Sequence, residues 1–281
     1  MKKMLAFIFA MSTLIANAHE ISAHEFSELF KHFDGCFILY SMDEHKIISE
    51  YNPNNRCSQR ISPNSTFKIP LSVMAFDQGI IHQNTVFKWT GEKGVLPEHE
   101  QDQTPKSWLQ YSVVWLSQQL TPKLGYDRIK HYLADFHYGN QDFTGDPGKH
   151  NGLQYAWIAS SLKISAIEEL QFLKNMLSHQ LQVKPDAIEN TKSNLYLGKL
   201  KNGADYYGKT GAGRHGRSER LENPSPLRDG WFVGFIQKGT ASYIFVSNLT
   251  DKEVPAATDT FYGSQILKPI TIKLLNDYFE T

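Results

Sequence analysis

The sequence predicts an α+β fold in which an antiparallel sheet, built from both ends of the chain, is flanked by helices and lies beside a helical region. Three observations predict it. Runs rich in β-branched and aromatic residues lie near both ends of the chain, at residues 35–51 and 230–247. Helical periodicity occupies roughly residues 66–200. The 281 residues are 41% hydrophobic and 12% aromatic, which suffices for a core and excludes a disordered protein.

The N-terminus has the pattern of a secretory signal peptide. Two lysines precede a mostly apolar stretch at residues 5–15, and a small-x-small cleavage site ends at Ala18. A buried first helix is the alternative. We expect residues 1–18 to be removed, which leaves residues 19–281 as one domain in the periplasm or outside the cell. Without the two lysines, the balance of 29 basic and 29 acidic residues becomes a net charge of −2.

This composition argues against several partners. Phosphate binding needs clustered Lys and Arg, and no basic block is present, so we expect no nucleic-acid partner. No stretch after residue 18 approaches the ~20 apolar residues that span a bilayer, so we expect no membrane anchor after cleavage. The histidines form no metal-binding spacing, and we expect solvated surface positions for the following ones: His19, His24, His45, His99, His150 and His215.

The first strands are predicted at residues 35–40 and 46–51, joined as a hairpin by a polar segment. Cys36 lies at the start of the first strand and Cys57 lies six residues after the second. An oxidising compartment permits a disulfide between them, but spacing alone cannot decide whether it forms. Both alternatives therefore stay open at this point.

Helices are predicted in the middle and at the end of the chain. Thr104 is a good N-cap with Pro105 at the first helical position, and apolar residues then recur at helical spacing up to Leu120. Three further helical segments cover residues 126–136, 164–177 and 265–278. The late strands at residues 230–236 and 241–247 lie between the last two of these helices.

Ser65 and Lys68 are the first pair with chemical meaning. Asn64 is predicted to cap a helix, and the i, i+3 spacing places Lys68 one turn above Ser65. A serine hydroxyl becomes a nucleophile when a base takes its proton, and an amine serves as that base only when it is neutral. The alternative for this common quartet is a capped helix with an exposed lysine.

Lys209, Thr210 and Gly211 form the second pattern, followed by Ala212 in a β-rich run. An edge strand carrying Lys and Thr, with Gly allowing close approach of the backbone, suits the binding of a carboxylate and an acyl group. Ser-x-x-Lys followed about 140 residues later by Lys-Thr-Gly is the pairing that penicilloyl-serine transferases display.

Six motifs in chain order resemble those of class D, oxacillinase-type serine β-lactamases, over essentially the whole chain after residue 18. They are Pro63-x-Ser65-Thr66-Phe67-Lys68, Ser112-Val113-Val114, Tyr138-Gly139-Asn140, Trp157 in Trp-x-x-x-Ser-Leu-Lys-Ile-Ser, Lys209-Thr210-Gly211, and Gly230-Trp231-Phe232-Val233-Gly234. Val114 distinguishes class D enzymes from class A enzymes and most penicillin-binding proteins, which are expected to carry Asn at this position. We find no match to a class A deacylating glutamate, and expect Glu168 and Glu169 to be exposed helical charges.

The resemblance implies hydrolysis of β-lactam antibiotics, penicillins and oxacillin-type compounds, through an acyl-enzyme on Ser65, and thereby antibiotic resistance. In this family CO2 adds to the active-site lysine, so Lys68 would become the general base for acylation and deacylation, with no metal and no other cofactor. A neutral amine is needed, and Phe67, Val114 and Trp157 would supply apolar surroundings that lower its pKa. Trp157 would also donate its indole N–H to the carboxylated lysine; otherwise it is a core anchor.

The resemblance also implies roles for the remaining motif residues. The Ser112 hydroxyl would relay a proton to the departing lactam nitrogen, and the backbone N–H groups of Ser65 and Ala212 would stabilise the oxyanion. Lys209 and Thr210 would hold the substrate carboxylate, with Gly211 beside them. Tyr138 would organise the site, or simply belong to a turn.

One departure from the family concerns the substrate carboxylate. Most members carry an Arg near the start of the C-terminal helix, whereas Lys268 is the cation found there in this chain. The alternatives are Arg214, Arg217 and Arg220, which follow Lys-Thr-Gly and could equally form a solvated loop.

Two other functions share part of this pattern. A penicillin-binding protein or β-lactam sensor domain would acylate without turnover, and a secreted binding module would retain only the fold. The sequence favours the hydrolase, with a small-molecule β-lactam as its partner and a monomer as the default state. The range of cephalosporins and carbapenems depends on loop shapes around residues 96–108 and 214–228, which sequence does not give.

Overall fold

The computed structural model describes residues 20–218 and 220–280. The proposed signal peptide lies outside these residues. A six-stranded antiparallel sheet has the order β2-β1-β6-β5-β4-β3. Its strands are β1 Phe33–Ser41, β2 Lys46–Tyr51, β3 Tyr196–Lys199, β4 Asp205–Arg214, β5 Arg228–Lys238 and β6 Ala241–Asp251. The predicted sheet from both chain ends is confirmed, since β1 pairs with β6 along its whole length.

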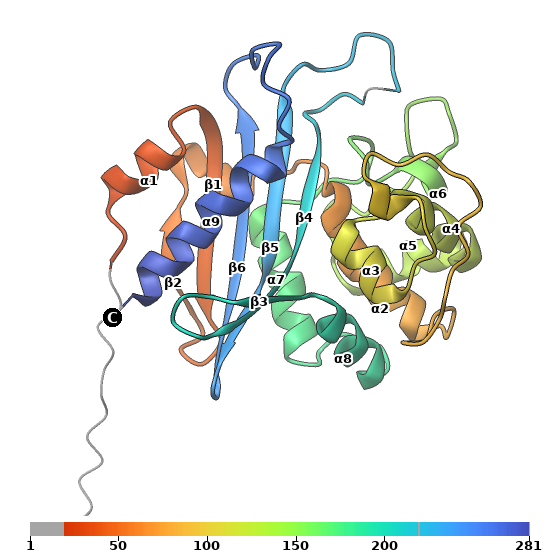
Figure 1. The fold of residues 1–281 in the computed structure, drawn as a ribbon, viewed down its shortest axis with the longest axis horizontal. Helices are drawn as coiled ribbons and strands as arrows, with labels where there is room; N and C mark the ends of the chain where they lie inside the picture. Colours follow the sequence, from red (N-terminus) through yellow and green to blue (C-terminus); the bar gives the residue numbers. More distant parts are fainter. Residues whose placement is uncertain (1–19, 219, 281) are drawn as a thin grey trace, which may run out of the picture.

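Helices flank the sheet and also form a separate region beside it (Figure 1). The helices are α1 Ala23–Leu29, α2 Lys68–Asp77, α3 Pro105–Tyr111, α4 Val114–Leu124, α5 Tyr126–Asp135, α6 Gly152–Tyr155, α7 Ala166–Leu177, α8 Pro185–Asn194 and α9 Gly263–Phe279. Figure 1 shows α9 in front of the sheet, α7 behind it, and α2 to α6 to one side. One core cluster lies between the sheet and α9, and a larger one joins the sheet to the helical region.

The predicted helix after Thr104 is interrupted at Ser112. Thr104 caps α3 as predicted, but Ser112 adopts left-handed backbone angles (φ 61°, ψ 36°), and a second helix, α4, begins at Val114. Periodicity could not show this break because Trp108 and Trp115 are buried on both sides of it. The interruption places the Ser112 hydroxyl at a helix junction instead of on a helix face.

The segment before α7 also differs slightly from the prediction. Ile164 forms an isolated bridge with Ile61, and Ser165 caps the helix by accepting from the Glu168 N–H. The bridge ties the segment before α7 to the segment before Ser65. This backbone pairing holds the start of α7 close to the segment that leads to Ser65.

Cys36 and Cys57 form a disulfide that joins β1 to the short 3₁₀ segment Pro53–Ser58. Both cysteines are fully buried, and their sequence separation is 21 residues. A crosslink over such a loop restricts the unfolded chain, which corresponds to about 3 kcal/mol of stability in the chain-entropy account.

We therefore expect the free energy of unfolding of a Cys36→Ala/Cys57→Ala double variant to be about 3 kcal/mol lower than that of the wild type. The variant should accordingly unfold at a lower urea concentration. Urea titration followed by circular dichroism measures this difference. The variant should be insensitive to added reductant, which serves as the internal control. Equal midpoints for the two proteins would show that the crosslink contributes nothing.

Candidate active site

Ser65 and Lys68 meet where a 3₁₀ turn, Asn64–Phe67, runs into α2. Ser65 is half-buried, whereas Lys68 is fully buried as the first residue of α2. The Lys68 Nζ donates a hydrogen bond to the Ser65 Oγ at 3.0 Å. Burial lowers the pKa of Lys68 to about 7, since a charged amine is poorly solvated there. A neutral amine beside a serine hydroxyl can accept its proton.

Asn64 does not cap this helix. Its φ of 51° is left-handed, and its side chain bridges two other segments. The amide Oδ1 accepts from the Ala159 N–H at 3.1 Å, and the Nδ2 donates to the Ser62 carbonyl at 3.1 Å. The prediction of an N-cap was wrong because the chain enters α2 through a 3₁₀ turn, which needs no such cap.

Lys209 and Ser112 form a second amine–hydroxyl pair. Lys209 projects from β4 and is buried, and its Nζ donates to the Ser112 Oγ and to the Thr210 carbonyl, both at 2.9 Å. Burial, followed by the nearby Lys68 and Lys268 charges, lowers the pKa of Lys209 well below its usual range. Among the described residues neither Lys68 nor Lys209 is paired with a carboxylate. The site is therefore electrostatically suited to an anionic ligand.

Gly211 and Gly213 let β4 lie directly against the turn that carries Ser65. A Cβ at Gly211 would come within 2.7 Å of the Pro63 carbonyl oxygen, and one at Gly213 within 2.3 Å of the Asn64 amide oxygen. β3 pairs only with residues 205–207 of β4, so the stretch from Lys209 onward forms an edge. Ala212 lies on that edge between the two glycines.

Trp157 belongs to an aromatic wall around the start of α2. It is fully buried and stacks on Phe67 with 5.5 Å between ring centroids, and on Phe143 with 6.0 Å. Tyr138 also contacts Phe67, at 6.0 Å between centroids. Val114, expected among the apolar surroundings, is instead 37% exposed, while its neighbour Val113 is fully buried.

His99 is buried, which corrects the expectation of a solvated surface histidine. Its Nε2 lies 2.8 Å from the Tyr111 carbonyl, and the Trp115 indole N–H donates to the His99 carbonyl at 2.9 Å. Because a carbonyl only accepts, the Nε2 must carry the proton. These bonds fix the residue before Ser112. No spacing in the sequence indicates this role, since the partners are backbone atoms.

Glu168 and Glu169 are not simply exposed charges. Glu168 completes a capping box with Ser165 and forms an ion pair with Arg60. Glu169 is fully buried near Tyr138, and neither Glu169 oxygen nor the Tyr138 hydroxyl has a hydrogen bond of normal geometry. Burial raises the pKa of Glu169 to about 8. Helical periodicity identified the helix, but the expectation that Glu169 is an exposed charge was wrong, because this side chain lies on the buried face.

Glu169 should make the stability of the protein depend on pH. Its folded pKa is raised, so the folded state binds more protons than the unfolded state between its ordinary range and about pH 8. The free energy of unfolding should therefore fall from pH 5 to pH 8, by roughly 3 kcal/mol, and Glu169→Gln should remove that fall. Urea titrations at both pH values measure it. Glu168→Gln is the control and should keep the wild-type fall; the same fall in Glu169→Gln would contradict the account.

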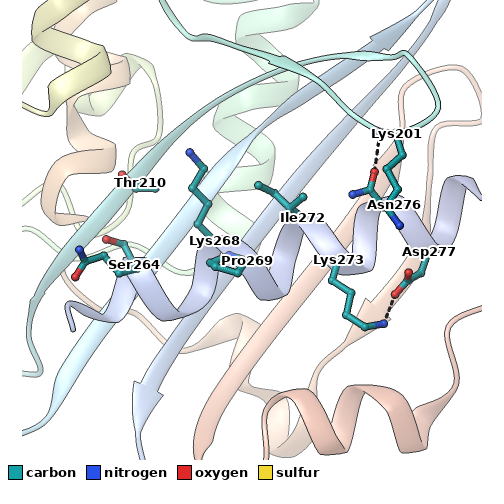
Figure 2. Close-up of a pocket in the computed structure, with 10 residues that line it drawn as sticks. Lys201, Thr210, Ser264, Lys268, Pro269, Ile272, Lys273, Asn276 and Asp277 are labelled. Carbon is teal, nitrogen blue, oxygen red and sulfur yellow. Dashed lines mark hydrogen bonds and ion pairs between the residues drawn. The ribbon is translucent and has the colours of Figure 1, made fainter. Parts of the chain in front are cut away.

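The four candidate cations for a substrate carboxylate differ in surroundings. Arg220 is bound to Asp146, the Arg214 Nη1 donates to the Pro226 carbonyl, and Arg217 is exposed. Lys268 is half-buried on α9, with its Nζ 5.7 Å from the centre of the Phe232 ring. It lines a cavity between α9 and β4 together with Thr210, and its side chain extends toward β4 (Figure 2). Burial lowers the pKa of Lys268, which has no carboxylate partner in the described part of the chain.

The fold and the two serine–lysine pairs define a serine acyl-transfer protein of the penicillin-binding type. A family model for the penicillin binding protein transpeptidase domain matches residues 35–276. The chain is 45% identical over 258 residues to β-lactamase OXA-1 of Escherichia coli, with 89% of this chain and 91% of that protein covered. The crystal structure of OXA-427 class D β-lactamase superposes with a TM-score of 0.72 at 33% identity, covering 86% of this chain and 99% of that one.

A methicillin resistance protein is also similar to this chain. The methicillin resistance mecR1 protein of Staphylococcus aureus is 34% identical over 270 residues, with 90% of this chain but 43% of that protein covered. The match to OXA-1 is higher and spans nearly the whole of both proteins. This chain therefore belongs to the class D β-lactamase family and is a serine hydrolase of that family.

Among the described residues, no group of His, Cys, Asp or Glu side chains could hold a metal ion. No described helix is long and apolar enough to cross a bilayer.

Proposed function

We propose that the protein hydrolyses penicillins and oxacillin-type β-lactams through an acyl-enzyme on Ser65, and thereby confers antibiotic resistance. The observation that carries this proposal is the 3.0 Å hydrogen bond from a buried, carboxylate-free Lys68 to Ser65. A serine beside a lysine with a pKa of about 7 is a poised nucleophile at neutral pH.

Lys68 is also suited to carboxylation by CO2, which attacks only neutral amines. It is fully buried next to Phe67, with no carboxylate partner among the described residues. When carboxylated, Lys68 supplies an oxygen base that serves both formation and hydrolysis of the acyl-enzyme. Trp157, which is fully buried and stacks on Phe67 and Phe143, would exclude bulk water from that base.

The other motif residues divide the remaining tasks. The backbone N–H groups of Ser65 and Ala212 hold the oxyanion that forms when the Ser65 Oγ attacks the lactam carbonyl. The Ser112 hydroxyl, which accepts from Lys209 at 2.9 Å, passes a proton to the lactam nitrogen as the ring opens. Val114 contributes its exposed face to the wall of the substrate site.

The substrate carboxylate binds to Lys209 and Thr210, with Lys268 as the additional cation. Burial and the nearby Lys268 charge both lower the pKa of Lys209, so an anion that binds between these two amines stabilises their charged forms. Arg220 is excluded from this role because its guanidinium is bound to Asp146.

Lys268→Ala should therefore raise KM for benzylpenicillin about tenfold, the loss of one charge-assisted contact, with little change in kcat. Steady-state kinetics measure both constants. The effect should vanish for the penicillin methyl ester, which has no carboxylate. Lys273→Ala, on the same helix but bound to Glu25 and Asp277, is the control. An unchanged KM in Lys268→Ala would assign the carboxylate to another cation.

Residues 1–18 are proposed to direct export to the periplasm, with residues 19–281 working there as a monomer. Size-exclusion chromatography and N-terminal sequencing of the exported protein test these two statements.

One experiment separates a hydrolase from a sensor. Purified protein is mixed with nitrocefin, and product is counted per enzyme molecule. Sustained turnover supports the proposal, and Ser65→Ala should abolish it. A single stoichiometric burst would mean a sensor or penicillin-binding protein that holds its acyl-enzyme. No acylation of Ser65, read by mass spectrometry, would leave only a binding module.

A further inference from the structure

The peptide that follows Trp157 is held in a strained conformation. Ala159 is buried and has a φ of 46°, in the left-handed region that costs a residue with a Cβ roughly 1–2 kcal/mol. Such strain persists only where the surrounding structure imposes it. Contacts from neighbouring segments must therefore hold Ala159 in this conformation.

Two hydrogen bonds hold this peptide from opposite sides. The Ala159 N–H donates to the Asn64 Oδ1 at 3.1 Å, and the Arg220 Nη2 donates to the Ile158 carbonyl at 2.6 Å. The first contact leads to the residue before Ser65. The second leads to the loop that follows β4, the strand that carries Lys209.

Arg220 is itself fixed by Asp146. Its Nε and Nη2 donate to the two Asp146 carboxylate oxygens at 3.0 and 3.2 Å, and its guanidinium carbon lies 4.3 Å from the centre of the Tyr155 ring. Asp146 is 3% exposed and also accepts from Ser160 at 2.7 Å and from Asn151 at 3.0 Å. A planar guanidinium with five donors can serve this carboxylate and the Ile158 carbonyl at once, which a lysine cannot.

We propose that Arg220 is a positioning residue that, together with Asp146, keeps the strained peptide at Ala159 in place and thereby holds Trp157 against Phe67. Phe67 precedes Lys68, so a shift of Trp157 opens the buried start of α2 to water. Water access stabilises the charged amine, and the pH at which Lys68 becomes neutral rises. This inference rests on the proposed function, and it concerns a residue that touches none of the reacting groups.

The test compares Arg220→Ala, Ala159→Gly and the double variant. Arg220→Ala should lower kcat for nitrocefin about tenfold, a modest displacement effect, and move the midpoint of the pH–rate profile to higher pH. Ala159→Gly alone should change little, because glycine adopts a positive φ without strain. In the double variant, glycine at position 159 adopts the positive φ without strain, so the peptide no longer needs Arg220 to hold it. Most of the lost rate and the original pH midpoint should therefore return.

Arg60→Ala is the matched control, because it also removes an arginine bound to a carboxylate through two nitrogens, but one bound to Glu168. It should leave the pH midpoint unchanged. Should Arg220→Ala fail to fold, Arg220→Lys tests the same point, with an intermediate shift expected because it keeps the charge but not both contacts. A pH midpoint and kcat that change no more than in Arg60→Ala, or no recovery in the double variant, would overturn the inference.

Hydrogen exchange gives a readout that does not depend on turnover. The backbone amides of residues 155–160 should exchange faster in Arg220→Ala than in wild type, and unchanged exchange would overturn the inference. If the wild-type protein fails to turn over nitrocefin while exchange in this segment still depends on Arg220, the proposed function fails and the positioning role stands.

Discussion

Replacing Lys68 with alanine is expected to lower the turnover of benzylpenicillin about 10³-fold, the range of an essential general base. The Lys68 Nζ is the hydrogen-bond partner of the Ser65 hydroxyl, and no carboxylate among the described residues is bound to it. Without this amine, neither the lysine nor its carboxylated form can take the Ser65 proton. The measurement is kcat/KM in buffer saturated with bicarbonate.

The fold should survive this change, because alanine removes a buried amine whose charged form is costly to desolvate. Urea titration should show equal or higher stability, which separates lost chemistry from lost structure. Lys201→Ala is the control: it removes a lysine that forms an exposed ion pair with Glu280, and it should retain wild-type turnover. Turnover within tenfold of wild type in Lys68→Ala would mean that another group is the base.

Replacing Gly211 with alanine is expected to lower kcat by about 10²-fold or more, the effect of losing an oxyanion-hole donor. The new methyl group would lie 2.7 Å from the Pro63 carbonyl oxygen and 3.2 Å from the Thr66 N, both backbone atoms beside Ser65. β4 must then move away from the turn, and the Ala212 N–H moves with it. Pre-steady-state nitrocefin kinetics should place the loss in acylation.

Gly239→Ala serves as its control. Gly239 has a φ of 62° and open space around its Cβ position, at the hairpin between β5 and β6. The substitution costs stability through backbone strain but does not touch the site, so kcat should be unchanged. A kcat for Gly211→Ala as high as that for Gly239→Ala would show that the close approach of β4 is not needed.

Strong local patterns explain why much of the fold was predictable. The hairpin of β1 and β2, the late strands and the C-terminal helix all carry patterns that hold within a few residues. The pairing of β1 with β6 joins the two chain ends, and it was predicted from strand patterns at both ends with a helical segment between them. The break at Ser112 was missed, since the contacts around its left-handed backbone are not local: Lys209 donates to the Ser112 hydroxyl, and His99 is bonded to the carbonyl of the preceding Tyr111.

The motifs predicted a set of site residues but not their arrangement. The motifs named Ser65, Lys68, Ser112, Lys209 and Trp157, and the structure brings the two lysines to two hydroxyls. Residues that act through backbone atoms left no signal of this kind. His99 is bonded to a backbone carbonyl, and Asn64 accepts from a backbone N–H. The burial of Glu169 also left no signal, because the sequence pattern of a helix does not show which of two adjacent glutamates is buried.

The central claim is that burial makes Lys68 neutral enough to serve Ser65 at physiological pH. The pH dependence of kcat/KM for benzylpenicillin, measured from pH 5 to pH 9 with and without bicarbonate, tests it most directly. Because the pKa of Lys68 is about 7, activity should rise with pH through that value, and bicarbonate should raise activity most at neutral and higher pH. Activity that is the same at pH 5 and pH 8 in bicarbonate-free buffer would contradict the account.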